Sequence, residues 1–274
     1  MALVCSQLSF RYPRAASDVL ADVSFAVSRG ELVGVAGASG CGKTTLLRLL
    51  AGLERPCAGT VTLDGEPLDG TVPRRIGLVQ QLPERQLFAA TAYDDVAFGP
   101  RTIGCSDEEV AERVEQALAS VGLDIERART TSPFAFSGGE QRRACIAGTL
   151  AMRPDYVLLD EPTAGLDPAQ RDALMGLLAQ RGVGVVVVSH DLDVLAEHVG
   201  RLVIIGDGGV RADGATADVA CDGRLLACAG LEQPLAARMA RRLRARGVAL
   251  ADGTATADAL VEALAACGRA GERA

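Results

Sequence analysis

The amino-acid sequence predicts an α/β fold with a largely parallel central β-sheet. Two continuous apolar runs, residues 156–159 and 183–188, are typical of parallel strands that are covered on both faces. A buried strand at residues 32–36 leads directly into a glycine-rich loop and an apolar helix. Between residues 84 and 152 the pattern is instead mainly helical. These three observations indicate an α/β domain that contains a helical subdomain.

The N-terminal part of the chain is predicted to consist of short strands. Apolar and polar residues alternate at residues 23–27, and a turn follows at residues 29–31. An edge strand that ends in a turn is expected at residues 60–65. Further strands are predicted at residues 3–4, 8–12 and 32–36.

A long helix is predicted at residues 107–121 in the helical subdomain. Val110, Val114 and Leu118 recur on one face of it. Ser106 is a suitable N-cap, and the acidic residues that follow it are favourable in a first turn.

The C-terminal part of the chain is predicted to be a helical extension. One more apolar strand is expected at residues 202–205. From about residue 211 the sequence is rich in alanine and arginine, which indicates helices at residues 234–246 and 257–266. We therefore predict a main domain at residues 1–210 and an extension at residues 211–274 that would take part in dimer formation.

Composition argues against several classes of protein. The net charge of −7 and the pI of about 5.0 argue against a nucleic-acid partner, because phosphate binding needs a basic surface. The longest aliphatic run, residues 185–188, is too short to cross a bilayer, and the N-terminus does not resemble a signal peptide. We expect a soluble, cytoplasmic protein whose membrane role depends on a partner.

The eight cysteines show no metal-ligand spacing. No two of them form a C-x-x-C pair, and the chain has only two histidines. We therefore expect reduced thiols rather than a zinc site, several of them acting as small core residues.

The clearest motif is the loop at residues 37–44, which reads G-A-S-G-C-G-K-T and fits the phosphate-binding pattern G-x-x-x-x-G-K-[ST]. Its glycines allow backbone N–H groups to surround phosphates at a helix N-terminus. Lys43 is the only lysine in the chain, against 27 arginines. A compact, flexible ammonium suits the β- and γ-phosphates better than the planar guanidinium of arginine.

Two carboxylates directly follow the apolar run at residues 156–159. Asp160 suits the Mg²⁺ shell, to which Thr44 would add a hydroxyl. Glu161 is then placed to polarise an attacking water. A GTPase is excluded because the chain has no asparagine for the guanine-reading Asn-Lys-x-Asp motif.

The segment Ser137–Arg143, S-G-G-E-Q-R-R, resembles the signature L-S-G-G-Q of the ABC ATPases. Residues 160–167 resemble the end of the family's Walker B motif and its D-loop, which ends at Asp167. Gln81, His190 and Tyr12 match the Q-loop, the switch histidine and the aromatic residue that stacks on adenine. These motifs occur in the family's order across residues 10–190, which excludes a small-molecule kinase.

The resemblance implies a P-loop ATPase core of ABC type with an N-terminal antiparallel β-subdomain. It implies ATP and Mg²⁺ as ligands, with Thr44, Gln81 and Asp160 at the Mg²⁺. Glu161, His190 and Gln81 would act in hydrolysis. The residues implied at ATP in the same subunit are Tyr12, Gly37, Ala38, Ser39, Gly40, Cys41, Gly42, Lys43, Thr44 and Thr45. The residues implied at the ATP of a second subunit are Ser137, Gly138, Gly139 and Glu140.

The signature departs from the family's text at two positions. Phe136 replaces leucine, and Glu140 replaces glutamine. Ser137 and Glu140 also form S-x-x-E, which predicts a capping box at a helix start. Glu140 places a negative charge near the partner's γ-phosphate and would weaken or tune closure of the two subunits. The second histidine, His198, is expected to be a surface or packing residue.

A finer resemblance is to the ATPases of energy-coupling factor transporters and related cobalt and nickel uptake systems. Residues 81–88 and 95–100 are similar to their Q-N-P-D-x-Q-L-F and D-V-A-F-G-P segments. This implies a second ATPase, identical or related, a transmembrane coupling subunit and a membrane protein that captures a vitamin or metal ion. An importer with a periplasmic binding protein is the alternative. A soluble repair or translation ATPase is disfavoured because the chain lacks a coiled-coil insertion and a second cassette.

Overall fold

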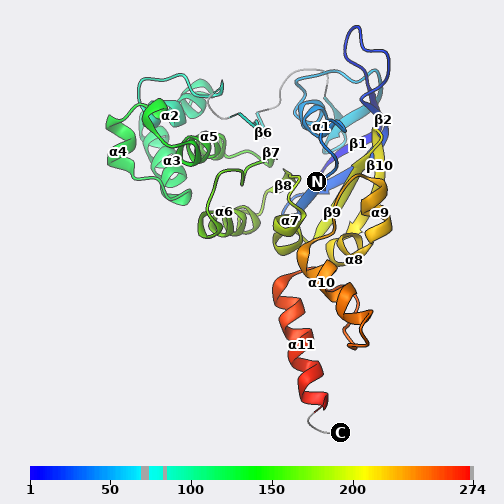
Figure 1. Cartoon of the computed structure of the whole chain (residues 1–274). Helices are drawn as coiled ribbons and strands as arrows, with labels where there is room; N and C mark the ends of the chain where they lie inside the picture. Colours follow the sequence, from blue (N-terminus) through cyan, green and yellow to red (C-terminus); the bar gives the residue numbers. More distant parts are fainter. Residues whose placement is uncertain (69–73, 83–84, 272–274) are drawn as a thin grey trace.

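The strands of the protein form two β-sheets in the computed structural model, which describes residues 1–68, 74–82 and 85–271 (Figure 1). The N-terminal sheet is antiparallel, and its strand order is β2 (Leu20–Ser28), β1 (Ala2–Phe10), β4 (Ala58–Leu63) and β5 (Glu66–Pro67). The central sheet has the order β10 (Gly209–Ala215), β9 (Arg201–Gly206), β3 (Leu32–Ala36), β8 (Gly184–Val188), β7 (Tyr156–Asp160) and β6 (Ile76–Val79). Its strands pair in parallel except β10 with β9, so the predicted α/β class is confirmed.

Helix α1 (Lys43–Leu50) belongs to the core that joins the two sheets. Val186 and Val188 of β8 face this core, whereas Val185 and Val187 face a second core on the other side of the central sheet. Because successive side chains of a strand point to opposite faces, a strand buried on both sides must be apolar throughout. This explains the continuous run from which the strand was predicted.

The helical subdomain lies to one side of the central sheet, drawn in green in Figure 1. Helix α3 (Asp107–Ser120) has the predicted N-cap at Ser106, which forms a capping box with Glu109. The other helices here are α2 (Ala92–Thr102), α4 (Ile125–Thr130), the 3-10 helix η2 (Pro133–Ala135) and α5 (Gly138–Ala151). They pack on the second core, so the subdomain is continuous with the central sheet.

The remaining helices follow the later strands. Helix α6 (Pro168–Gln180) lies between β7 and β8, and helix α7 (Leu192–His198) lies between β8 and β9. The last four are α8 (Thr216–Cys221), α9 (Gly223–Cys228), α10 (Leu235–Arg244) and α11 (Ala257–Gly271), and α11 points away from the body of the protein (Figure 1). A small core that includes Ala240, Leu250 and Leu260 holds α10 against α11. No helix among the described residues combines the length and apolar character that a membrane span requires.

Three details of the strands differ from the predictions. Residues 3–4 and 8–12 do not form separate strands, because β1 is continuous through an irregularity at Gln7, which has a φ of 49°. Tyr12 lies beyond the end of this strand. The stretch from about residue 211 begins as a strand, since β10 continues to Ala215 by pairing with β9.

Strand β6 was not predicted from the sequence. It is short and contains Gly77, which reads as a breaker. A Cβ at Gly77 would lie 2.3 Å from the Thr149 side chain of α5, so the glycine allows close packing of that helix. This requirement is tertiary and leaves no pattern in the neighbouring residues.

Candidate functional site

The predicted nucleotide-binding residues meet at one edge of the central sheet. Strands β3 and β7 both pair in parallel with β8, so their carboxyl ends lie side by side. The glycine-rich loop follows β3, Asp160 and Glu161 end β7, and His190 follows β8. Residues more than 100 positions apart are therefore neighbours because of strand order alone.

The glycine-rich loop at residues 37–44 is shaped by its glycines. Gly42 has a φ of 102°, which disfavours any side chain, and a Cβ at Gly37 would lie 2.3 Å from the Ile205 carbonyl oxygen. Lys43 Nζ donates to the carbonyl oxygens of Gly37 (2.7 Å) and Ala38 (3.0 Å). The loop thus holds its ammonium at the N-terminus of α1, where backbone N–H groups favour anions.

Thr44 and Asp160 bring two oxygen ligands together beside this loop. The Thr44 hydroxyl donates to Asp160 Oδ2 at 2.6 Å, and Asp160 is buried. Burial raises the pKa of this carboxyl, while the Thr44 hydroxyl and the Lys43 charge act in the opposite direction. A hydroxyl and a carboxylate are a suitable donor set for Mg²⁺.

The Glu161 carboxylate is held from the end of β8. One oxygen lies 2.9 Å from the His190 backbone nitrogen and 2.7 Å from His190 Nδ1, and the other accepts from the Ser189 hydroxyl at 3.1 Å. Glu161 is only 7% exposed, whereas the His190 side chain is 70% exposed. The carboxylate is fixed, and the imidazole beside it opens to solvent. The sequence analysis overlooked Ser189, whose only signal is its place between the strand and His190.

Arg142 is a second residue that the sequence analysis did not identify. Its buried guanidinium donates to the carbonyl oxygens of Glu161 (2.6 Å), Ala164 (2.8 Å) and Gln81 (3.0 Å). The Arg142 side chain therefore connects α5 to the segment at residues 160–167 and to Gln81, which were predicted from the sequence as separate motifs. It lies in the segment Ser137–Arg143, but nothing in the sequence indicates that its side chain turns toward β7.

Tyr12 and Asp167 have local partners. The Tyr12 hydroxyl lies 3.0 Å from Thr45 Oγ1, so the ring lies beside the first turn of α1. Asp167 caps α6 by accepting from the Gln170 backbone nitrogen at 2.8 Å. His198 lies 3.1 Å from Asp172 and far along α7 from His190, which agrees with the prediction of a packing or surface role.

The Ser137–Arg143 segment begins α5 and forms the predicted capping box, with Ser137 as N-cap and Glu140 at the third helical position. Ser137, Gly138 and Gly139 line a cavity of about 500 Å³ on the helical subdomain. The start of the glycine-rich loop and His190 line a different cavity of about 310 Å³, and the two sets of lining residues do not overlap. Within the described residues, the two halves of the predicted ATP site therefore occupy separate places on one chain.

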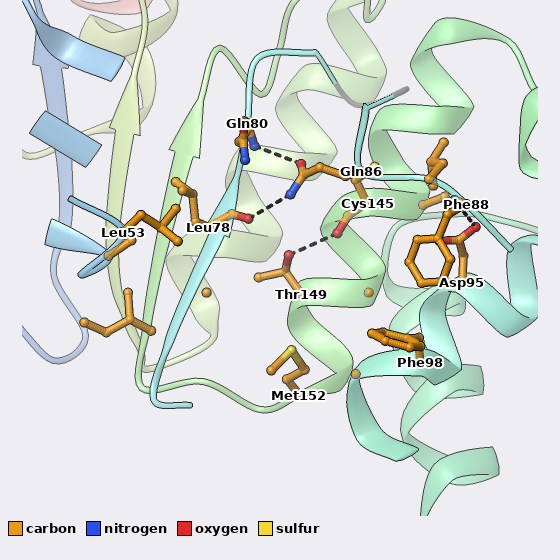
Figure 2. A pocket seen from close by; sticks show the side chains of 17 residues that line it. Leu53, Leu78, Gln80, Gln86, Phe88, Asp95, Phe98, Cys145, Thr149 and Met152 are labelled. Carbon is orange, nitrogen blue, oxygen red and sulfur yellow. Dashed lines mark hydrogen bonds between the residues drawn. The ribbon is translucent and has the colours of Figure 1, made fainter. Parts of the chain in front are cut away.

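An apolar groove of about 330 Å³ lies between β6 and the helical subdomain (Figure 2). Phe88 and Phe98 meet edge to face there, with ring centroids 4.8 Å apart, and are 60% and 52% exposed. The Asp95 carboxylate fixes the backbone at Phe88 and Ala89, because it accepts hydrogen bonds from their backbone nitrogens at 3.1 Å and 2.8 Å. Pro83 and Glu84, which belong to the segment used for the finer resemblance, lie outside the described residues.

All eight cysteines lie within the described residues and are free, as predicted. Cys5 and Cys145 are buried in the cores, and Cys41, Cys105, Cys221 and Cys267 are partly buried against them.

Comparison with known proteins finds a matching family and many similar chains, among them the following three. The sequence model described as "ABC transporter" matches residues 20–164. The chain is 41% identical over 254 residues to the energy-coupling factor transporter ATP-binding protein EcfA2 of Symbiobacterium thermophilum, covering 89% of this chain and 88% of that protein. The structure of CbiO1 from Clostridium perfringens, part of the ABC transporter complex CbiONQ, has a TM-score of 0.73 and 29% identity, covering 87% of this chain and 98% of that chain. A dimeric ATP-binding cassette with bound ADP and phosphate has a TM-score of 0.71 and 29% identity, covering 79% of this chain and 99% of that chain.

Proposed function

The chain belongs to the ABC transporter family of ATP-binding proteins, and from this we propose that it is the ATP-hydrolysing subunit that powers uptake of a vitamin or metal ion by an energy-coupling factor type transporter. The observation that carries the proposal is the meeting of Lys43, Asp160, Glu161 and His190 at one sheet edge. The similarity to EcfA2 over 254 residues supports the transporter type, because it extends well beyond the ATPase motifs.

ATP is bound by the glycine-rich loop in this proposal. Backbone N–H groups of residues 37–44 and the Lys43 ammonium take the phosphates, and Tyr12 stacks on the adenine. Thr44 and Asp160, with Gln81, would hold Mg²⁺, which neutralises charge on the β- and γ-phosphates when bound. The 2.6 Å contact between the Thr44 hydroxyl and the Asp160 carboxylate supports this donor set.

Hydrolysis is assigned to Glu161 and His190. Glu161 accepts a hydrogen bond from the attacking water and polarises it, while the contacts from Ser189 and His190 keep its carboxylate oriented. The exposed side of the imidazole faces the γ-phosphate. Catalysis of this kind is mostly positioning and charge stabilisation, so the groups that orient Glu161 contribute to the rate.

The active unit is a pair of ATPase subunits. Ser137, Gly138 and Gly139 line a separate cavity from the glycine-rich loop of the same chain, so a complete site needs the loop of one subunit and the signature segment of another. The dimeric cassette with bound ADP and phosphate, to which this chain is similar, supports such an arrangement. The partner is a second copy or a related ATPase, and Asp167 lies at the interface between them.

The apolar groove beside Phe88 is proposed to receive a helix of the transmembrane coupling subunit. The groove lies between the helical subdomain and β6, and β6 leads directly to Gln81. A shift caused by a helix bound in the groove can therefore be transmitted to the nucleotide site through a short stretch of chain. Two exposed aromatic rings in edge-to-face contact are typical anchors for a partner side chain. The subunit would act at the cytoplasmic face of the membrane.

Phe88→Ala is expected to weaken association with the membrane subunit by about fivefold to tenfold, because it removes an exposed aromatic anchor. ATP binding should be unchanged, since Phe88 makes no contact with the nucleotide-binding loop. The measurement is co-purification from detergent-solubilised membranes, quantified against wild type. Phe134→Ala is the matched control, because Phe134 is 56% exposed on the same subdomain but does not line the groove. Loss of folding in Phe88→Ala would instead assign Phe88 to the core.

Arg142→Gln is expected to lower ATP turnover by about tenfold to a hundredfold with a smaller change in ATP affinity. The substitution removes charged hydrogen bonds to three carbonyl groups, of which that of Glu161 is buried, and none of the three belongs to the glycine-rich loop. Steady-state kinetics separate the two effects. Arg181→Gln is the control, because Arg181 is also partly buried and donates to the Ser120 hydroxyl, but does not line the cavity of the signature segment. Equal losses in both variants would rule out a specific role for Arg142.

Purification of the chain with its native membrane partners tests the function as a whole. We expect a transmembrane coupling subunit, a small substrate-capture membrane protein and a second ATPase, together with ATP hydrolysis by the complex. Recovery with a periplasmic binding protein would indicate the other class of importer. A chain that associates with no membrane protein would contradict the proposal.

A further inference from the structure

One arginine contacts both residues at which the signature segment departs from the family's text. The Arg127 guanidinium of α4 lies over the Phe136 ring, 4.7 Å from its centroid. The same guanidinium forms a two-pronged ion pair with the Glu140 carboxylate. Phe136 and Glu140 are therefore linked through a third residue that lies outside the signature segment.

Glu140 in turn controls Ser137, the residue proposed to meet the γ-phosphate of a partner's ATP. A single carboxylate oxygen of Glu140 accepts from the Ser137 backbone nitrogen (2.8 Å) and from its hydroxyl (2.9 Å). The Ser137 hydroxyl also accepts from the Glu140 backbone nitrogen at 3.4 Å. The position and proton of the Ser137 hydroxyl are thus set by Glu140 within the same chain.

The hydrogen bond from Arg127, and after it that from the Ser137 backbone, lowers the pKa of the Glu140 carboxyl to about 2, so the carboxylate keeps its charge well below neutral pH. Its side chain is only 18% exposed. Without a compensating cation, this charge would oppose the approach of a triphosphate to Gly138 and Gly139. Arg127 is the cation that contacts it.

We propose that Arg127 is a positioning residue of the signature segment: it clamps Glu140 through an ion pair and a stack on Phe136, and offsets the negative charge that Glu140 presents to the ATP bound by the second subunit. The inference rests on the proposed function, since it concerns the composite ATP site. It explains how a glutamate is tolerated next to a bound phosphate. Arg127 does not touch the reacting atoms and acts only through Glu140 and Ser137.

The test is a double-substitution cycle in the full chain. Arg127→Gln is expected to lower ATP turnover, and ATP-dependent association in the Glu161→Gln background, by about threefold to tenfold. When Glu140→Gln is already present, Arg127→Gln should change either quantity less than about twofold, because no charge remains to be offset. The activity of Glu140→Gln alone is the reference against which Arg127→Gln is compared in that background.

Arg129→Gln is the matched control. Arg129 lies on the same helix, pairs with Glu115 and lies over the Tyr93 ring at 4.2 Å, but has no contact with the signature segment. Its substitution should have little effect with either residue at position 140. Raising the salt from 0.1 M to 1 M, which shortens the Debye length from about 10 Å to about 3 Å, should reduce the difference between Arg127→Gln and Arg129→Gln.

If Arg127→Gln causes equal losses with glutamate and with glutamine at position 140, Arg127 only stabilises the fold and the inference is wrong. The inference is also wrong if Arg127→Gln causes no loss in either background. If Arg127→Gln does not fold, Arg127→Lys replaces it in both backgrounds, where loss of the planar fork should lower activity with glutamate at position 140 and change it less than about twofold with glutamine. Failure of the proposed function looks different, because wild type and Glu140→Gln would then show neither ATP turnover nor ATP-dependent association. That result would overturn this inference as well.

Discussion

Glu161→Gln is expected to lower ATP hydrolysis by about a hundredfold or more while leaving Mg-ATP binding intact. The amide keeps the size of the side chain, and its single oxygen can still accept a hydrogen bond from either Ser189 or the His190 backbone. It has no negative charge with which to polarise a water molecule. Since binding depends on residues 37–44 and hydrolysis on Glu161, the two properties should separate in this variant.

The variant should therefore accumulate as an ATP-bound closed dimer. Light scattering during size-exclusion chromatography measures the association, and phosphate release measures turnover. Ser189→Ala is an informative comparison, because it removes one hydrogen bond to Glu161 but retains the carboxylate, and should cost less than tenfold. Glu197→Gln, an exposed acid on α7, should behave as wild type. Hydrolysis at the wild-type rate in Glu161→Gln would remove Glu161 from the mechanism.

Sequence reasoning was most successful where the relevant structure is local. Residues 37–44 are a strand-to-helix connection whose glycines and lysine define it within eight positions. The N-cap at Ser106 and the capping box at Ser137 are likewise local, and both were found as predicted. The meeting of Asp160 with Thr44 could also be anticipated, because ends of neighbouring parallel strands lie at the same edge.

What the sequence could not predict depends on packing between distant segments. Arg142 reads as one more polar residue after the signature, and only the fold shows that its side chain joins Gln81 to Glu161. Strand β10 carries glycines and an aspartate that disfavour a strand, and it forms because β9 offers an edge to pair with. The link from Arg127 to Glu140 spans two helices, and no spacing rule connects them.

The single lysine of the chain makes a direct test of the nucleotide site possible. An amine-specific acylating reagent has two targets, Lys43 and the N-terminal amine of Met1, which is 78% exposed. Acylation removes the charge of Lys43 and leaves a single N–H in place of the ammonium that now donates to both Gly37 and Ala38. We expect modification of Lys43 to abolish ATP binding. Prior addition of Mg-ATP should protect Lys43 and leave the N-terminal amine reactive.

Lys43→Arg is expected to weaken ATP binding by about tenfold to a hundredfold, although the charge is kept. The loop closes around a compact ammonium through two carbonyl oxygens at 2.7 and 3.0 Å, a site to which a planar guanidinium is poorly matched. Arg48→Lys provides the matched control, because it places a second lysine on the same helix, paired with Glu54 and away from the loop. Mass spectrometry should find that lysine labelled equally with and without Mg-ATP. If Lys43 were labelled equally as well, the nucleotide would not sit on this loop, and the assignment of ATP hydrolysis to this sheet edge would fail with it.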